Sequence, residues 1–97
     1  MADFSPAHPG DVLRDDFLKP LGLSQYALAK AIGVPQIRIS EIVNGKRAIT
    51  PDTALRLARY FKTSAEFWMG MQTTHDLEIA RDRIGKKINA RVQPRAA

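Results

Sequence analysis

Residues 24–45 read SQYALAKAIGVPQIRISEIVNG, and this stretch decides the fold. Ser24 is predicted to cap a helix over residues 25–32, because its hydroxyl can accept a free N–H of the first turn. Gly33 then ends that helix, as glycine does in left-handed C-terminal caps. A second helix is predicted over residues 35–44, only two residues further on. Two helices this close must cross steeply, which describes a helix-turn-helix.

Helices are also predicted on both sides of this motif, and no alternating β-branched run indicates a strand. A first helix is expected from Pro9 to just before Pro20, where the proline stops it. A fourth begins after Thr50, and a fifth after Thr63 or Ser64, with Thr63 opening a capping box. The apolar stripe of the fourth helix is expected to contain Ala54, Leu55, Ala58 and Phe61.

The end of the chain permits a sixth helix over residues 76–92. Its recurring apolar residues are Leu77, Ala80, Ile84 and Ile88. Gly85 weakens this helix by ~1 kcal/mol. We therefore expect an all-α fold with a five-helix domain over residues 1–80, containing the helix-turn-helix at about 24–44. Residues 81–97 are expected to form a basic tail that is partly helical or disordered.

Charge is distributed unevenly around a net +5. Residues 35–62 hold six basic and two acidic side chains, and residues 81–97 hold six and one. Residues 63–80 hold three acidic side chains and no Lys or Arg. A basic block inside a folded segment indicates a surface that faces phosphates. The alternative is a solvated surface followed by a charged tail.

Composition and motifs disfavour several classes of protein. The chain has no cysteine, and its two histidines, His8 and His75, lie far apart in sequence, so we expect no metal and no cofactor. The sequence contains no phosphate-binding loop and no residue placed to act as a general base, so nothing in it suggests an enzyme. No apolar run reaches the ~18–20 residues that span a bilayer, and Met1 to Phe4 do not begin a signal peptide. We expect a cytoplasmic protein without a membrane partner.

The second helix of the motif has the residues of a DNA-recognition helix. At about 100° per residue, Ile42 and Val43 share the inner face with Ile39. The other face carries amide, hydroxyl and apolar groups that match base edges and thymine methyls in a major groove. The expected base-contacting residues are Gln36, Ile37, Arg38, Ser40, Glu41 and Asn44.

The role of Glu41 stays open, and three further residues are expected to contact the backbone of the DNA. Glu41 either accepts from cytosine or pairs with Arg38 at i, i+3. Lys46 and Arg47 follow the recognition helix, and Gln25 begins the preceding one, so all three are expected to approach phosphates.

One recognition helix reads few base pairs, so we expect a homodimer on a palindromic operator in double-stranded DNA. The fifth helix holds more apolar side chains than one helix buries inward. Its expected interface residues are Phe67, Trp68, Met69 and Met71.

Between Leu21 and Arg47 the sequence resembles the Cro/C1-type (XRE) helix-turn-helix family. The segments that match its pattern are Leu23-Ser24-Gln25, Leu28-Ala29, Ile32-Gly33-Val34, Ile39-Ser40-Glu41-Ile42 and Asn44-Gly45-Lys46. The flanks resemble its HigA branch of VapI-type antidote proteins, through His8-Pro9-Gly10, residues 44–50, residues 52–58 and residues 63–68. Met69-Gly70-Met71 departs from the leucine-rich run usual after the tryptophan, and residues 81–97 match nothing.

This resemblance implies a function. In the wider family, the residues matching Gln25, Gln36, Ile37 and Glu41 contact operator DNA. In the HigA branch, the implied role is the antitoxin of a type II toxin–antitoxin pair. Such a protein represses its own operon as a homodimer and neutralises a cognate ribonuclease toxin. The alternative is a free-standing transcriptional regulator without a toxin partner.

Overall fold

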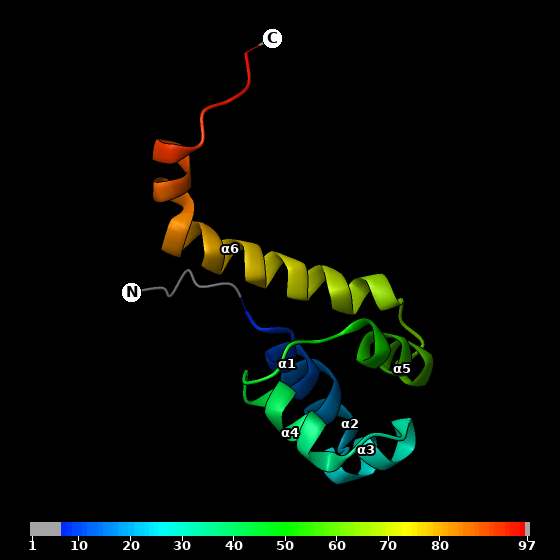
Figure 1. The fold of residues 1–97 in the computed structure, drawn as a ribbon. Helices are drawn as coiled ribbons and strands as arrows, with labels where there is room; N and C mark the ends of the chain where they lie inside the picture. Colours follow the sequence, from blue (N-terminus) through cyan, green and yellow to red (C-terminus); the bar gives the residue numbers. More distant parts are fainter. Residues whose placement is uncertain (1–6, 97) are drawn as a thin grey trace.

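Seven consecutive helical segments make up most of residues 7–96, the part of the chain that this computed structural model describes, and no strand occurs among those residues. They are α1 (Pro9–Val12), the π-helical η1 (Leu13–Leu18), α2 (Lys19–Leu21), α3 (Gln25–Ile32), α4 (Gln36–Val43), α5 (Pro51–Phe61) and α6 (Ala65–Arg91). The first three are continuous and form one rod, so this part of the chain has five helices (Figure 1). The expected all-α, five-helix fold is confirmed.

The first rod differs from its prediction because it contains a π turn. The Lys19 N–H donates to the oxygen of Arg14, five residues back. The helix was expected to end before Pro20, but it continues one residue past it. A proline ring normally clashes with the carbonyl four residues earlier, and the wider π turn relieves that clash. The same turn brings both Leu13 and Leu18 into the core.

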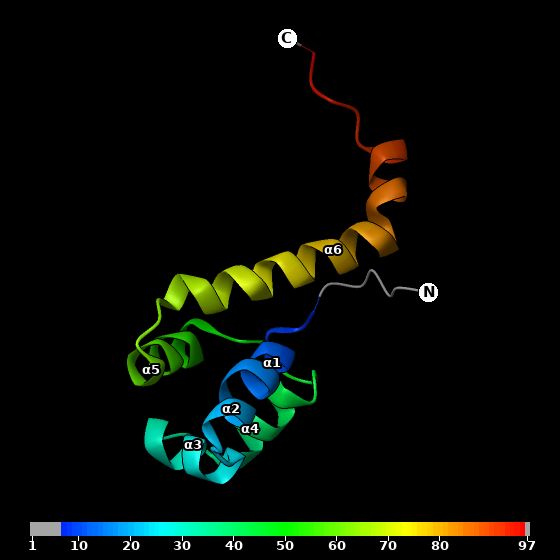
Figure 2. The same cartoon turned by 180° about the vertical axis from the view of Figure 1, so that it is seen from behind.

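Helices α3 and α4 form the expected helix-turn-helix and cross at the base of the molecule (Figures 1 and 2). Ser24 Oγ accepts from the N–H of Ala27 at 3.0 Å, as its N-cap position predicts. Gly33 ends α3 with φ = 75°. Pro35 lies at the N-cap of α4, and Asn44 at its C-cap, so α4 is one residue shorter at each end than expected.

Helix α5 begins after Thr50 as expected, but its inner face is different. Ala54 and Leu57 are fully buried, whereas Leu55, expected inside, is 63% exposed. Residues one apart on a helix point about 100° apart, so Leu55 turns away when Ala54 faces the core. Thr50 makes no capping hydrogen bond, and its hydroxyl contacts that of Thr53 at 3.5 Å.

Helix α6 begins after Ser64, one of the two expected starts, but without the expected capping box. Ser64 Oγ accepts from the N–H of Phe67 at 3.0 Å, so Ser64 is the N-cap. The capping box at Thr63 is wrong, because the Thr63 hydroxyl accepts instead from Trp68 Nε1 at 2.9 Å. This bond satisfies the indole N–H of the largest fully buried side chain in the core.

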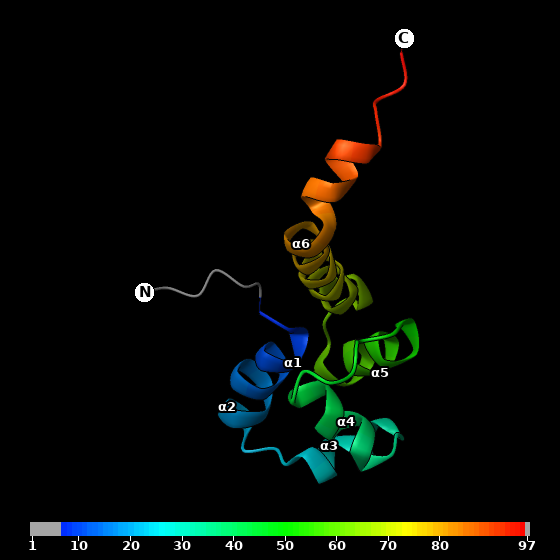
Figure 3. The same cartoon turned by 60° about the vertical axis from the view of Figure 1, so that its left-hand side comes forward.

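The predicted fifth and sixth helices are a single helix of 27 residues. Gly85 does not interrupt it. Helix α6 lies across the other helices, and its C-terminal part bends and extends beyond them (Figures 1 and 3). No helix among residues 7–96 is long and apolar enough to cross a membrane.

The N-terminus of α1 packs between α4 and α6. His8 Nδ1 accepts from the N–H of Gly10 at 2.9 Å, and the His8 ring meets that of His75 at a centroid distance of 4.9 Å. Burial and the neighbouring His75 lower the pKa of His8, which keeps Nδ1 free to accept at neutral pH. A Cβ atom on Gly10 would lie only 1.8 Å from the carbonyl oxygen of Ile42. This close approach sets the distance between α1 and the recognition helix.

Replacing Gly10 with alanine should therefore lower the free energy of unfolding by about 2–3 kcal/mol, because α1 and α4 must move apart. Gly70→Ala is the matched control, since an added Cβ there meets no atom within 4 Å. That control should gain up to ~1 kcal/mol from helix propensity. Urea denaturation measures both. Wild-type stability of Gly10→Ala would contradict the close packing.

Candidate nucleic-acid interface

The recognition helix α4 buries one face and exposes the other, as the sequence predicts. Ile39 and Ile42 are fully buried. Ile37 is 61% exposed, and Gln36 and Asn44 are exposed beside it. An isoleucine kept in water loses the stabilisation that burial would give it. Contact with a thymine methyl would remove it from water, while the amides supply donors and acceptors for base edges.

Glu41 has a partner that neither sequence-based alternative identified. Its Oε1 accepts from Nε of Arg47 at 2.8 Å and from Nη2 at 2.7 Å. The predicted pairing with Arg38 is wrong. The chain reverses after α4 at Gly45, whose φ is 73°, and this turn brings Arg47 back beside Glu41. A longer-range pair thereby replaces the i, i+3 pair expected within the helix.

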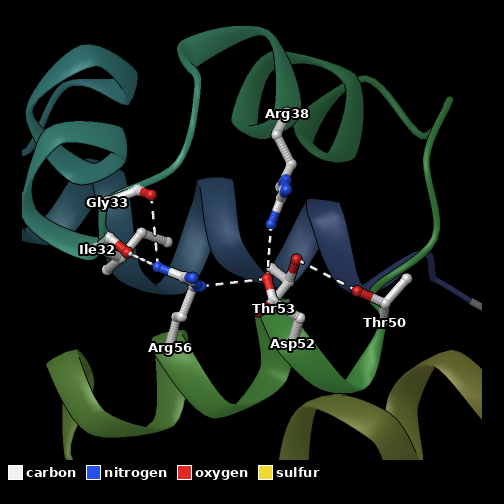
Figure 4. A network of polar contacts seen from close by, with 7 residues as sticks. All are labelled: Ile32, Gly33, Arg38, Thr50, Asp52, Thr53 and Arg56. Carbon is white, nitrogen blue, oxygen red and sulfur yellow. Dashed lines mark hydrogen bonds and ion pairs between the residues drawn. The ribbon is translucent and has the colours of Figure 1, made fainter.

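Arg38 instead belongs to a network that joins three helices (Figure 4). Its Nη1 contacts Asp52 Oδ2 on α5 at 2.7 Å. The same oxygen accepts from Arg56 Nε at 3.1 Å. Arg56 Nη1 in turn donates to the carbonyl oxygens of Ile32 at 2.7 Å and Gly33 at 3.4 Å, at the end of α3. Hydrogen bonds from Arg38, and then from Arg56, lower the pKa of Asp52, so its carboxylate stays ionised at neutral pH.

The remaining predicted contacts border the face of α4. Ser40 is half-buried on α4, and Lys46 and Arg47 are exposed in the turn that directly continues it. Gln25 is half-buried at the first position of α3, which packs against α4. The structure thus gathers most of the predicted residues on α4 and its following turn.

A buried glutamine holds the loop after that turn. Gln72 Oε1, on α6, accepts from the backbone N–H of Ile49 at 2.7 Å. Its Nε2 donates to Asp76 at 2.9 Å. Both polar ends of this side chain are therefore satisfied, although it is only 5% exposed.

The residues expected at a dimer interface differ in their exposure. Phe67 is 41% exposed, but Met69 and Met71 are half-buried and pack against the core. Trp68 is fully buried within the single chain, so its predicted role at an interface is wrong. Its ring packs on Phe17 at a centroid distance of 5.0 Å, which explains why it points inward.

A family model for the helix-turn-helix matches residues 16–68, which include α3, α4 and α5. The chain belongs to the helix-turn-helix family. A relative in Dichelobacter nodosus, virulence-associated protein I, is 58% identical over 73 residues, covering 75% of this chain and 68% of the relative.

Solved structures with the same fold specify the branch of the family. The chain matches the antitoxin HigA of Pseudomonas aeruginosa, solved with the higBA promoter, at 43% identity and a TM-score of 0.91, covering 94% of this chain and 99% of that one. It matches the antitoxin GraA in complex with its operator at 37% identity and a TM-score of 0.91, covering 100% and 98%. This helix-turn-helix protein falls in the HigA (VapI-type) antitoxin branch of the Cro/C1 family.

Three residues of this helix-turn-helix protein escaped the sequence analysis. Asp52 and Arg56 are spaced i, i+4, a spacing that could have indicated their pairing. Nothing in the sequence links Asp52 to Arg38, fourteen residues away, or Gln72 to Ile49. These contacts form only when α5 and α6 pack beside α4.

Asp52→Asn should release Arg38 toward DNA, because the amide cannot hold two arginines as an ionised carboxylate does. We expect tighter binding to random DNA and a salt dependence steeper by about one counterion. Asp16→Asn on η1 is the control, since it removes the same charge away from α4. Fluorescence anisotropy at several salt concentrations measures both variants. Equal salt slopes in Asp52→Asn and Asp16→Asn would show that Asp52 does not restrain Arg38.

Proposed function

We propose that this chain is a DNA-binding transcriptional repressor and the antitoxin of a type II toxin–antitoxin module. It binds a palindromic operator as a homodimer, represses its own operon and neutralises a ribonuclease toxin. It works in the cytoplasm, where operator DNA lies, and has no catalytic activity of its own. The observation that carries the DNA-binding role is the exposed Ile37, flanked by amide side chains on a helix whose opposite face is buried.

The antitoxin role rests on the likeness to HigA and GraA over almost the whole chain. Their structures were solved with a promoter and with an operator, respectively. The residues proposed to contact DNA here are Gln25, Gln36, Ile37, Arg38, Ser40, Glu41, Asn44, Lys46 and Arg47. Arg38 and Arg47 already have carboxylate partners, so each must exchange or share that partner when it meets DNA.

Gln36→Ala and Ile37→Ala should each weaken binding to the operator by ~1–3 kcal/mol and leave binding to random DNA nearly unchanged, because both residues face the bases. Lys46→Ala is the matched comparison. It should weaken both kinds of binding alike and flatten the salt dependence, because it removes a phosphate contact. Electrophoretic mobility shifts with operator and scrambled DNA measure the difference. Unchanged operator binding by Gln36→Ala and Ile37→Ala would place the base-reading surface elsewhere.

The antitoxin role is tested by co-expression with the small protein encoded in the neighbouring reading frame. That protein should arrest growth when expressed alone. This chain should restore growth and co-purify with it. The double variant Gln36→Ala/Ile37→Ala should rescue as well as the wild type, since it keeps the fold while losing operator contacts. If no neighbouring protein is toxic or bound, the chain is a free-standing regulator.

A further inference from the structure

A groove of about 320 Å³ lies between the start of the first rod and α6. Its lining is mainly apolar and consists of Ala7, Val12, Phe67, Gly70, Met71 and Thr74. A Cβ atom added to Gly70 would meet no atom within 4 Å, so the groove is open at this point. Phe67, at its edge, is 41% exposed. An apolar groove that is open to solvent is a surface of the kind that receives a side chain of a partner.

The groove faces away from the surface that is proposed to bind DNA. Val12 lies two residues after Gly10, so the Cβ directions of these two positions on α1 differ by about 160°. Gly10 faces the Ile42 carbonyl of α4, whereas Val12 lines the groove. In all three views α1 lies between α6 and α4 (Figures 1, 2 and 3). A partner seated in the groove would therefore leave the exposed face of α4 free for the operator.

Both walls of the groove belong to acidic segments of a chain that is basic as a whole. Residues 7–18 and 63–80 together contain six acidic side chains and a single Lys or Arg, which is Arg14, whereas the net charge of the chain is +5. Three of these acids already have basic partners, as Arg14 contacts Asp11 and Asp15 and Arg81 contacts Glu78. The groove thus lies at the meeting point of the two segments that have an excess of negative charge.

Two carboxylates at one end of the groove have no basic partner. Asp16 lies about one turn after Val12 on the same side of the first rod, and Glu66 directly precedes Phe67. The ring of Phe17 lies 6.2 Å from that of Phe67, which places η1 beside the start of α6. Both carboxylates are exposed, and neither takes part in an ion pair within residues 7–96. This end of the groove is therefore suited to a cationic group.

We propose that this groove is the docking site of the toxin, which inserts an apolar side chain there and places Lys or Arg beside it. A ribonuclease must hold a polyanionic substrate, so it carries positive charge on its surface. Asp16 and Glu66 would each gain a cationic partner, and Phe67 and Met71 would be removed from water. The inference rests on the antitoxin role of the proposed function and adds the surface through which that role is performed.

Other occupants fit the groove less well. Nucleic acid would be repelled by the unpaired carboxylates. A second copy seated on the same surface across a two-fold axis would bring the acidic segments of both chains together. Phe67 and Met71, which were expected at a dimer interface from the sequence, are therefore assigned here to the toxin.

Gly70→Arg tests the groove, because the new side chain would fill the open space and add a positive charge. Gly85→Arg is the matched control, since it makes the same change on the same helix, where an added Cβ meets only Arg81 at 3.9 Å. The probe is the protein of the neighbouring reading frame, immobilised for biolayer interferometry. Gly70→Arg should bind it at least about tenfold more weakly than the wild type, and Gly85→Arg should bind it like the wild type. Operator binding should be unchanged in both variants.

The charge at the groove gives a second, independent test. Asp16→Lys and Glu66→Lys should each slow association with the same immobilised protein and make the rate less dependent on salt. Asp82→Lys is the matched control, because Asp82 is an exposed acid in the basic part of α6, away from the groove. Its association rate should stay close to that of the wild type.

A thiol label tests occupancy of the groove directly. The chain has no cysteine, so Gly70→Cys and Gly85→Cys each provide one thiol for a maleimide. A saturating amount of the neighbouring protein should slow labelling at position 70 and leave labelling at position 85 unchanged. Circular dichroism should show that all variants remain helical.

The possible failures can be told apart. Wild-type affinity of Gly70→Arg, or labelling of Gly70→Cys that the neighbouring protein does not slow, overturns this inference while the antitoxin role stands. Loss of self-association by Gly70→Arg in analytical ultracentrifugation would assign the groove to a second copy and overturn it as well. A neighbouring protein that does not bind the wild type overturns the antitoxin role itself, and the inference falls with it.

Discussion

Burial of Ile39 and Ile42 is the interaction on which the remaining architecture depends. Helix α4 has only eight residues, and isolated helices of that length are unstable in water. It exists because these two side chains are fully buried among the neighbouring helices. The same burial fixes which side of α4 is left for solvent and DNA. Its position is then set by Gly10, whose lack of a side chain allows α1 to approach the Ile42 carbonyl.

Features encoded by neighbouring residues could be predicted from the sequence. The Ser24 cap, the Gly33 stop and the outward direction of Ile37 depend on spacing within one or two turns, and the structure has them as expected. Features that depend on packing could not be predicted. Trp68 takes the hydroxyl of Thr63, so Ser64 caps α6 instead. The branch of the family was apparent from the segments that flank the motif, whereas the continuity of α6 was not.

The ion pairs of α4 also depend on packing, and for that reason the sequence did not predict their partners. The sequence suggested a pair within α4, yet Glu41 pairs with Arg47 and Arg38 pairs with Asp52. Both observed pairs join α4 to a segment that follows it in the chain, so they form after the backbone has turned. Two arginines of the candidate interface are therefore already paired with carboxylates before DNA binds. Contact of Arg38 or Arg47 with phosphate competes with a carboxylate that is present in the same molecule, which favours sites that offer base contacts as well.

The π turn in the first rod has a consequence for comparing lengths of related sequences. A π turn accommodates one more residue than an α-helical turn over nearly the same axial distance. Two homologous rods that differ by one residue can therefore start and finish at equivalent points in space. An alignment gap within residues 13–18 would be structurally acceptable, although gaps are conventionally assigned to loops. In this chain, an insertion can be absorbed inside a helix that carries part of the core.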